Sequence, residues 1–139
     1  MKVILDANII IGFLLTKGYI ISSIFDYWER NTYTLLISDD ILEEYKLTLK
    51  KLIDLDTIDK FQANALLRKI SKKAKRVKVV IRLKKSSDKK DNRYLECAKT
   101  GKADYLVTRD KGHLLSIKRF KYTTIIGATK FLEALKSRL

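Results

Sequence analysis

Short apolar runs alternate with stretches of helical spacing along the whole chain. Val3, Ile4 and Leu5 form an unbroken apolar run with β-branched members, which is typical of a strand buried on both faces of a parallel sheet. Similar patterns predict further strands at residues 33–37, 77–83, 104–108 and 123–126. Apolar residues at helical spacing predict helices at residues 9–28 with a break at Gly18, and at 39–53, 58–74, 88–99, 114–117 and 128–136.

This alternation of strand and helix predicts an α/β fold with a mostly parallel sheet sandwiched between helices. The run at residues 77–83 is interleaved with Lys and Arg, so we expect that strand near the sheet edge. Ser38 is predicted to be the N-cap of the helix that follows it. A length of 139 residues is typical of one domain, so we expect a single domain over residues 1–139.

The net charge indicates which partners the protein could bind. The chain has 30 Lys and Arg against 16 Asp and Glu, a formal net charge of +14. Such a charge favours polyanionic partners, nucleic acid first and an anionic membrane surface second. The alternative is a Lys-rich surface that is merely well solvated. No apolar run approaches the ~18 residues of a membrane span, and we expect no signal peptide, because Lys2 leads straight into the first strand.

The cysteine count and the absence of two glycine motifs exclude further classes of protein. Cys97 is the single cysteine, so an internal disulfide is excluded, which fits a reducing, cytoplasmic location. No sequence of the G-x-x-x-x-G-K or G-x-G-x-x-G type occurs, so nucleotide-cofactor functions have no motif to rest on.

Two acids follow predicted core strands directly. Asp6 comes after the first apolar run and Asp110 comes just after the strand at 104–108. Both positions lie at the carboxyl edge of a parallel sheet, where open α/β folds hold ligands. The alternative for each is an ordinary turn former or helix cap. Asp104 precedes its strand and is expected at the opposite end of the sheet.

Two further acids lie on predicted helices. Asp91 projects from the centre of an apolar face that Tyr94, Leu95 and Ala98 define, where a charge is unexpected. Its alternative role is a helix cap. In the helix after Ser38, both Glu43 and Glu44 flank the apolar stripe, and Glu44 lies slightly closer to it.

An α/β fold could bring four of these carboxylates, Asp6, Glu44, Asp91 and Asp110, to one edge. Without a counter-ion such a cluster would repel itself. Oxygen ligands without a nearby histidine or thiolate favour Mg²⁺ or Mn²⁺ over zinc. An acidic, metal-loaded pocket in a basic protein is expected of a metal-dependent phosphodiesterase that acts on nucleic acid.

The sequence resembles the PIN-domain nucleases, of the kind that form the toxin half of toxin–antitoxin pairs. The resemblance covers essentially the whole chain and rests on four segments, Val3–Ile10, Ser38–Tyr45, Asp88–Ala98 and Ala103–Asp110. It implies a three-layer αβα sandwich with about five strands, Mg²⁺ or Mn²⁺ held by the four acids, and single-stranded RNA as substrate. It also implies an antitoxin protein as a partner, while the oligomeric state, including a homodimer, stays open.

Carried over residue by residue, Asn8 and Thr108 match the polar positions that support the acids. Arg109 stands where the family commonly has a small residue, and the loop at 111–113 looks one residue long. Both departures bear on Asp110, and Arg109 could instead reach the scissile phosphate. The basic stretch that includes Lys72, Lys73 and Lys75 is expected to line the RNA path together with Arg109.

Two other functions are compatible with the residues. One is an aspartate-based phosphoryl-transfer domain with Asp6 as nucleophile, against which the charge and the Asn at position 8 count. The other is a non-catalytic module that keeps the fold and binds RNA or an antitoxin. His113 is the only histidine, so a metal-free route through paired histidines is excluded.

Overall fold

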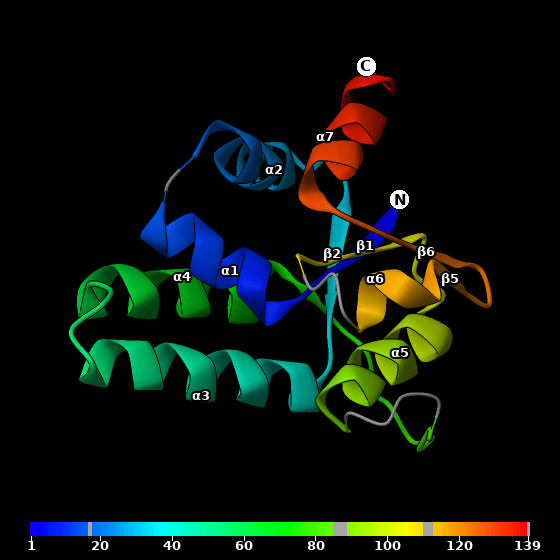
Figure 1. Ribbon diagram of the computed structural model, residues 1–139, viewed down its shortest axis with the longest axis horizontal. Helices are drawn as coiled ribbons and strands as arrows, with labels where there is room; N and C mark the ends of the chain where they lie inside the picture. The colour runs from blue at the N-terminus through cyan, green and yellow to red at the C-terminus, as the bar shows by residue number, and fades with distance from the viewer. Residues whose placement is uncertain (17, 85–88, 110–112, 139) are drawn as a thin grey trace.

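The structure, a computed structural model, describes residues 1–16, 18–84, 89–109 and 113–138 (Figure 1). A six-stranded sheet lies at its centre, in the order β3-β2-β1-β4-β6-β5. The strands are β1 (Lys2–Leu5), β2 (Thr34–Ile37), β3 (Lys75–Arg76), β4 (Tyr105–Val107), β5 (Arg119–Phe120) and β6 (Thr123–Ile126). The helices are α1 (Ala7–Leu15), α2 (Tyr19–Glu29), α3 (Asp39–Asp54), α4 (Lys60–Lys73), α5 (Lys89–Gly101), α6 (Leu114–Ile117) and α7 (Ala128–Lys136).

The sheet is parallel except at one edge. β1 pairs in parallel with β2 on one side and with β4 on the other, and β3 and β6 continue the parallel order outward. Among the strands that the structure describes, only β5 runs antiparallel, against β6. The result is the expected three-layer α/β fold with a mostly parallel sheet, with β5 as a short addition to the five strands expected.

Helices lie on both sides of the sheet. Figure 1 shows α5 and α6 on one side of the central strands and α1 and α2 on the other. Helix α2 packs against α7 and α1 against α3, while α5 contacts β1, β2 and β4. The aromatic side chains of Trp28, Tyr45, Tyr94 and Phe131 are almost fully buried among the aliphatic residues of the strands. This packing fixes the strand ends from which the site is built.

The caps of two long helices explain where those helices begin. Ser38 Oγ accepts a hydrogen bond from the N–H of Ile41 at 3.2 Å, which confirms Ser38 as the N-cap of α3. Asp59 does the same for α4, where its carboxylate accepts the Gln62 N–H at 2.8 Å. The helix predicted at 9–28 with a break at Gly18 is two helices. α1 ends at Leu15 and α2 begins at Tyr19.

The strand predicted at residues 77–83 is wrong. The structure has only Lys75 and Arg76 in β3, and residues 77–84 form neither strand nor helix. Exposure alternates along this segment, with Val77 buried and Val80 76% exposed. The segment is instead held by Glu96 of α5, whose carboxylate accepts the Leu83 N–H at 2.8 Å. The alternation therefore occurs in a segment that the structure assigns to no strand.

Helix length and apolarity bear on membrane insertion. Taken singly, each helix of the described ranges is too short or too polar to cross a bilayer. α1 and α2 reach the required length and composition only as a pair, across a sharp bend.

Candidate active site

Asp6 lies where the direction of the chain crossovers reverses. From β1 the connections run outward to β2 and β3, and the chain then returns to place β4 on the other side of β1. The carboxyl ends of β1 and β4 flank this switch point, where open α/β folds form their ligand crevice. Asp6 follows β1 and Thr108 follows β4, and the Asp6 N–H donates to the Val107 carbonyl at 2.9 Å.

Asp6 is a buried carboxyl surrounded by neutral hydrogen-bond donors. Only 8% of its surface is exposed, and the Thr108 hydroxyl donates to its Oδ2 at 2.6 Å. Burial raises the pKa of Asp6, and hydrogen bonds from Thr108, from the backbone N–H of Asn8 and from the Tyr94 hydroxyl oppose that increase only in part. The site therefore stabilises the charged form of Asp6 incompletely by itself.

Sequence reasoning missed the role of Tyr94, which it used only as a marker of the apolar face. Its hydroxyl accepts the Ala7 N–H at 3.0 Å and lies within hydrogen-bonding reach of both the Asp6 and the Glu44 carboxyls. Burial, followed by the negative charges of Asp6 and Glu44, holds the pKa of Tyr94 well above its usual value. Tyr94 thus places a hydroxyl from a third element near two of the predicted site acids, which a phenylalanine could not do.

Glu44 lies on the side of α3 that faces this tyrosine. Its side chain is 14% exposed, and Arg93 places its Nε 3.9 Å from Oε2. Glu43 is exposed. The structure therefore brings Glu44, and not its neighbour, next to Tyr94 and Asp6.

Asp91 is buried, as its place on the apolar face requires. It is 6% exposed and lies one helical turn before Tyr94 on the same face of α5. Asp110, the fourth predicted acid, lies outside the described residues. Asp104 is at the other end of the sheet, as expected, where its carboxylate accepts the Lys2 N–H at 2.8 Å.

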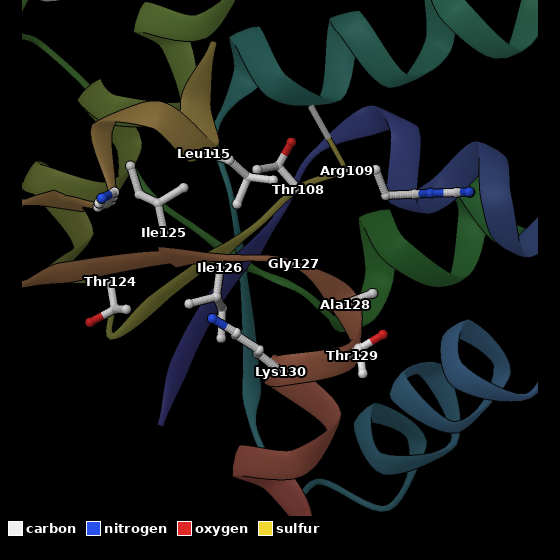
Figure 2. Close-up of a pocket in the computed structure, with 11 residues that line it drawn as sticks. Thr108, Arg109, Leu115, Thr124, Ile125, Ile126, Gly127, Ala128, Thr129 and Lys130 are labelled. Atoms are coloured by element: carbon white, nitrogen blue, oxygen red, sulfur yellow. The ribbon is translucent and has the colours of Figure 1, made fainter. Parts of the chain in front are cut away.

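Two polar neighbours connect the switch point to the segment after β4. Asn8 Oδ1 accepts the Arg109 N–H at 3.2 Å, and Thr108 contacts Asp6 as described above. Figure 2 shows the Arg109 side chain directed away from β6. It passes over α1 at Gly12, where an added Cβ would lie 2.8 Å from its Nη1. The glycine leaves the space that the guanidinium occupies, so the larger residue at position 109 is accommodated by α1.

The three lysines predicted to bind RNA have different surroundings. Lys72 and Lys75 are exposed on α4 and β3. Lys73 donates to the carbonyl of Glu29 at 3.0 Å and lies over the ring of Trp28, 5.3 Å from its centroid. Lys73 therefore has a structural contact of its own, and an RNA-binding role for these lysines stays a prediction.

The donor set fits a hard divalent cation in chemistry. Asp6, Glu44 and Asp91 offer oxygen atoms only, and the described partners of the buried Asp6 carboxyl are neutral. A cation would supply the compensation that these partners do not. Within the ranges the structure describes, no three acidic, histidine or cysteine side chains approach closely enough to hold an ion by themselves. The fit is thus one of donor type and burial, with Asp110 lying beyond the described part.

Comparison with known proteins gives the family. The family model described as the PIN domain matches residues 2–112, and the chain therefore belongs to the PIN-domain family. Proteins of this family are generally nucleases and typically depend on a divalent metal. The sequence matches no curated protein.

Two solved structures share the fold. PAE2754 from Pyrobaculum aerophilum is 18% identical, with 99% of this chain and 90% of that chain covered and a TM-score of 0.66. VapBC2 from Rickettsia felis, solved bound to a DNA fragment from its promoter, is 16% identical, with 91% of this chain and 98% of that chain covered and a TM-score of 0.61. At these identities the two structures support the fold alone.

Proposed function

We propose that this protein is a metal-dependent endoribonuclease that hydrolyses phosphodiester bonds of single-stranded RNA. The observation that carries the proposal is the buried Asp6 carboxyl at the switch point of the sheet, with the Tyr94 hydroxyl and the charge of Glu44 close by. Asp91 on the same face of α5 and Asp110 after β4 complete the proposed acidic set. The net charge of +14 around an acidic site suits a polyanionic substrate.

The side chains of this site would bind and orient Mg²⁺ or Mn²⁺. Asp6, Glu44 and Asp91 would hold the ion, with Asp110 completing the set or recruiting a second ion. When bound, such an ion activates water for attack and neutralises charge that develops on the phosphate. The Thr108 hydroxyl keeps one Asp6 oxygen in place by the hydrogen bond that it donates.

We also propose that this chain is the toxin of a toxin–antitoxin pair and that its partner is a cognate antitoxin protein. The PIN-domain family membership and the fold shared with the VapBC2 complex support this assignment. A small reading frame beside its gene that encodes an antitoxin would be the most direct observation. A cytoplasmic location is proposed with this role.

Cleavage of labelled single-stranded RNA in Mn²⁺ and in EDTA tests the enzyme function. We expect cleavage in Mn²⁺ only, with 5′-phosphate and 3′-hydroxyl ends. Asp6→Asn, Asp91→Asn and Glu44→Gln should abolish it, because each removes an ion ligand. Glu43→Gln is the matched control, since it makes the same change on the neighbouring, exposed residue and should leave the rate unchanged. A dead Glu43→Gln and an active Glu44→Gln would reverse the assignment of the two glutamates.

Two other outcomes would favour other functions. Metal-independent RNA binding with no cleavage by the wild type would favour a non-catalytic RNA-binding module. An acid-labile phosphoryl group on Asp6 would favour an aspartate-based phosphoryl-transfer domain.

A further inference from the structure

A cavity of about 840 Å³ opens at the carboxyl ends of β4 and β6, next to the acidic site (Figure 2). This volume is in the range of ligand-binding pockets, ~300–1,000 Å³. Its walls come from the end of β4, from β6 and α6, and from the first turn of α7. The lining residues are Thr108, Arg109, Leu115, Lys118, Thr124, Ile125, Ile126, Gly127, Ala128, Thr129 and Lys130.

The side chains in this cavity are of two kinds. Lys118 and Lys130 are cationic, and Thr124 and Thr129 add hydroxyl groups. Figure 2 shows the Lys130 side chain reaching back toward Ile126. The rest of the wall is aliphatic, and the lining residues that the structure describes include no acid. A ligand that suits both kinds of surface has an anionic group joined to a flat or apolar one, as a nucleotide does.

Thr108 lies between the cavity and the acidic site, because it lines the one and contacts Asp6 of the other. Thr108 donates its hydroxyl to Asp6 at 2.6 Å and its N–H to the Ile126 carbonyl at 3.0 Å. β4 and β6 are the next two strands after β1, and neighbouring strands lie about 4.8 Å apart. A polynucleotide with one phosphate at Asp6 would therefore reach the cavity with the adjacent part of its chain.

We propose that this cavity binds one nucleotide of the RNA strand next to the scissile phosphodiester. Its phosphate would contact Lys118 and Lys130, and its base would lie against the aliphatic wall at Leu115 and Ile126. The inference rests on the proposed nuclease function for the identity of the strand, but occupancy of the cavity by a nucleotide can be measured without cleavage.

Direct titration tests occupancy. Isotope-labelled wild-type protein in EDTA is titrated with a nucleoside 5′-monophosphate, and amide chemical shifts are followed by NMR. We expect saturable shifts at residues 124–130 and at Lys118. The same titration with inorganic phosphate separates a nucleotide site from a simple anion site. Shifts that phosphate reproduces in full, or shifts confined to other parts of the chain, overturn the proposal.

A pair of charge-reversed double variants tests the link to RNA. Lys118→Glu with Lys130→Glu alters the cavity, and Lys102→Glu with Lys60→Glu is the matched control. Lys118 and Lys102 both have positive φ, 66° and 54°, and Lys130 and Lys60 both lie in the first turn of a helix. The two variants therefore share their net-charge change and their backbone settings.

Affinity for a short RNA in EDTA should fall in the cavity variant at least ~10-fold more than in the control, because each lost charge-assisted contact is worth about a factor of ten. Equal affinities in the two variants overturn the proposal, even if the wild type cleaves RNA. If the wild type binds the nucleotide in the cavity but cleaves no RNA, the nucleotide site is supported and the nuclease function fails. The two proposals therefore fail separately.

Discussion

Burial disfavours the charged form of the Asp6 carboxyl, and its hydrogen bonds offset this only in part. Because burial raises its pKa above the ordinary value of 3.8, the folded state holds this proton more tightly than the unfolded state. The free energy of unfolding without metal should therefore fall as the pH rises from 3.8 toward neutrality. Asp6→Asn removes this titration, so in EDTA it should gain stability relative to wild type over that range.

Urea unfolding of the two proteins over a pH series in EDTA measures this difference. Below the ordinary pKa of Asp6 the advantage of the variant should vanish, since the wild-type carboxyl is then protonated in both states. A difference between the two proteins that does not change with pH would contradict the expectation.

The second informative substitution removes the hydroxyl of Tyr94. Tyr94→Phe keeps the buried ring but leaves the Ala7 N–H without its acceptor and removes the hydroxyl that lies near the Asp6 and Glu44 carboxyls. We expect a loss of ~1–3 kcal/mol in stability and a weaker affinity for Mn²⁺. Denaturant unfolding and Mn²⁺ titration give the two quantities.

Tyr33→Phe is the matched control for that change. The Tyr33 hydroxyl is also buried and donates to the Ile24 carbonyl at 2.9 Å, away from the site acids. It should lose stability in the same range and keep its Mn²⁺ affinity. Equal Mn²⁺ affinity in both variants would limit Tyr94 to a packing role.

Elements differ in how well their sequences predict them. The run at 3–5 is apolar throughout and is followed by an acid, so local pattern alone predicted β1 and the place of Asp6. The residues at 77–83 alternate apolar and basic side chains, yet they form no strand, and the Leu83 N–H donates to Glu96 of α5, a contact that no local pattern reveals. The position of Tyr94 near the Asp6 and Glu44 carboxyls likewise depends on the packing of three elements, the end of β1, α3 and α5. Local sequence therefore predicts the residues that end strands better than those that join elements.

The lysines at the end of α4 and in β3 are predicted to make RNA affinity depend on salt concentration. Each phosphate contact steepens the dependence of log affinity on log salt by ~0.7 for a single strand. Reversing the charges of Lys72, Lys73 and Lys75 should flatten that slope if these elements line the RNA path. Part of any effect of Lys73 would be structural, because it bonds Glu29. RNA binding measured at several salt concentrations gives the slope.

An unchanged slope would indicate that RNA binds another surface of the protein. The cavity beside β6 contributes Lys118, and Arg119 and Lys121 follow it on the same edge of the sheet. Charge reversal there should then flatten the slope instead.

At the scale of the whole molecule, a net charge of +14 surrounds a small set of buried acids. The fold places Asp6 and Glu44 from different elements around one hydroxyl, and Asp91 one turn away from it. If these carboxyls repel one another, the protein without metal carries that repulsion in its folded state, and metal relieves it. Binding to the folded state alone raises stability by about 2.7 kcal/mol at a hundredfold excess over Kd, so wild type should melt higher in Mn²⁺ than in EDTA.

Asp91→Asn separates a metal ligand from a structural acid. As a ligand, Asp91 contributes one charge to the cluster, so its removal should leave the EDTA melting temperature equal or higher and reduce the gain from Mn²⁺. As a helix cap near the start of α5, it would cost up to ~1 kcal/mol on substitution and leave the Mn²⁺ response intact. Thermal melts of wild type and variant in the two buffers give opposite patterns for the two roles. An undiminished Mn²⁺ shift in the variant would remove Asp91 from the site and leave Asp6 and Glu44, on either side of Tyr94, as its centre.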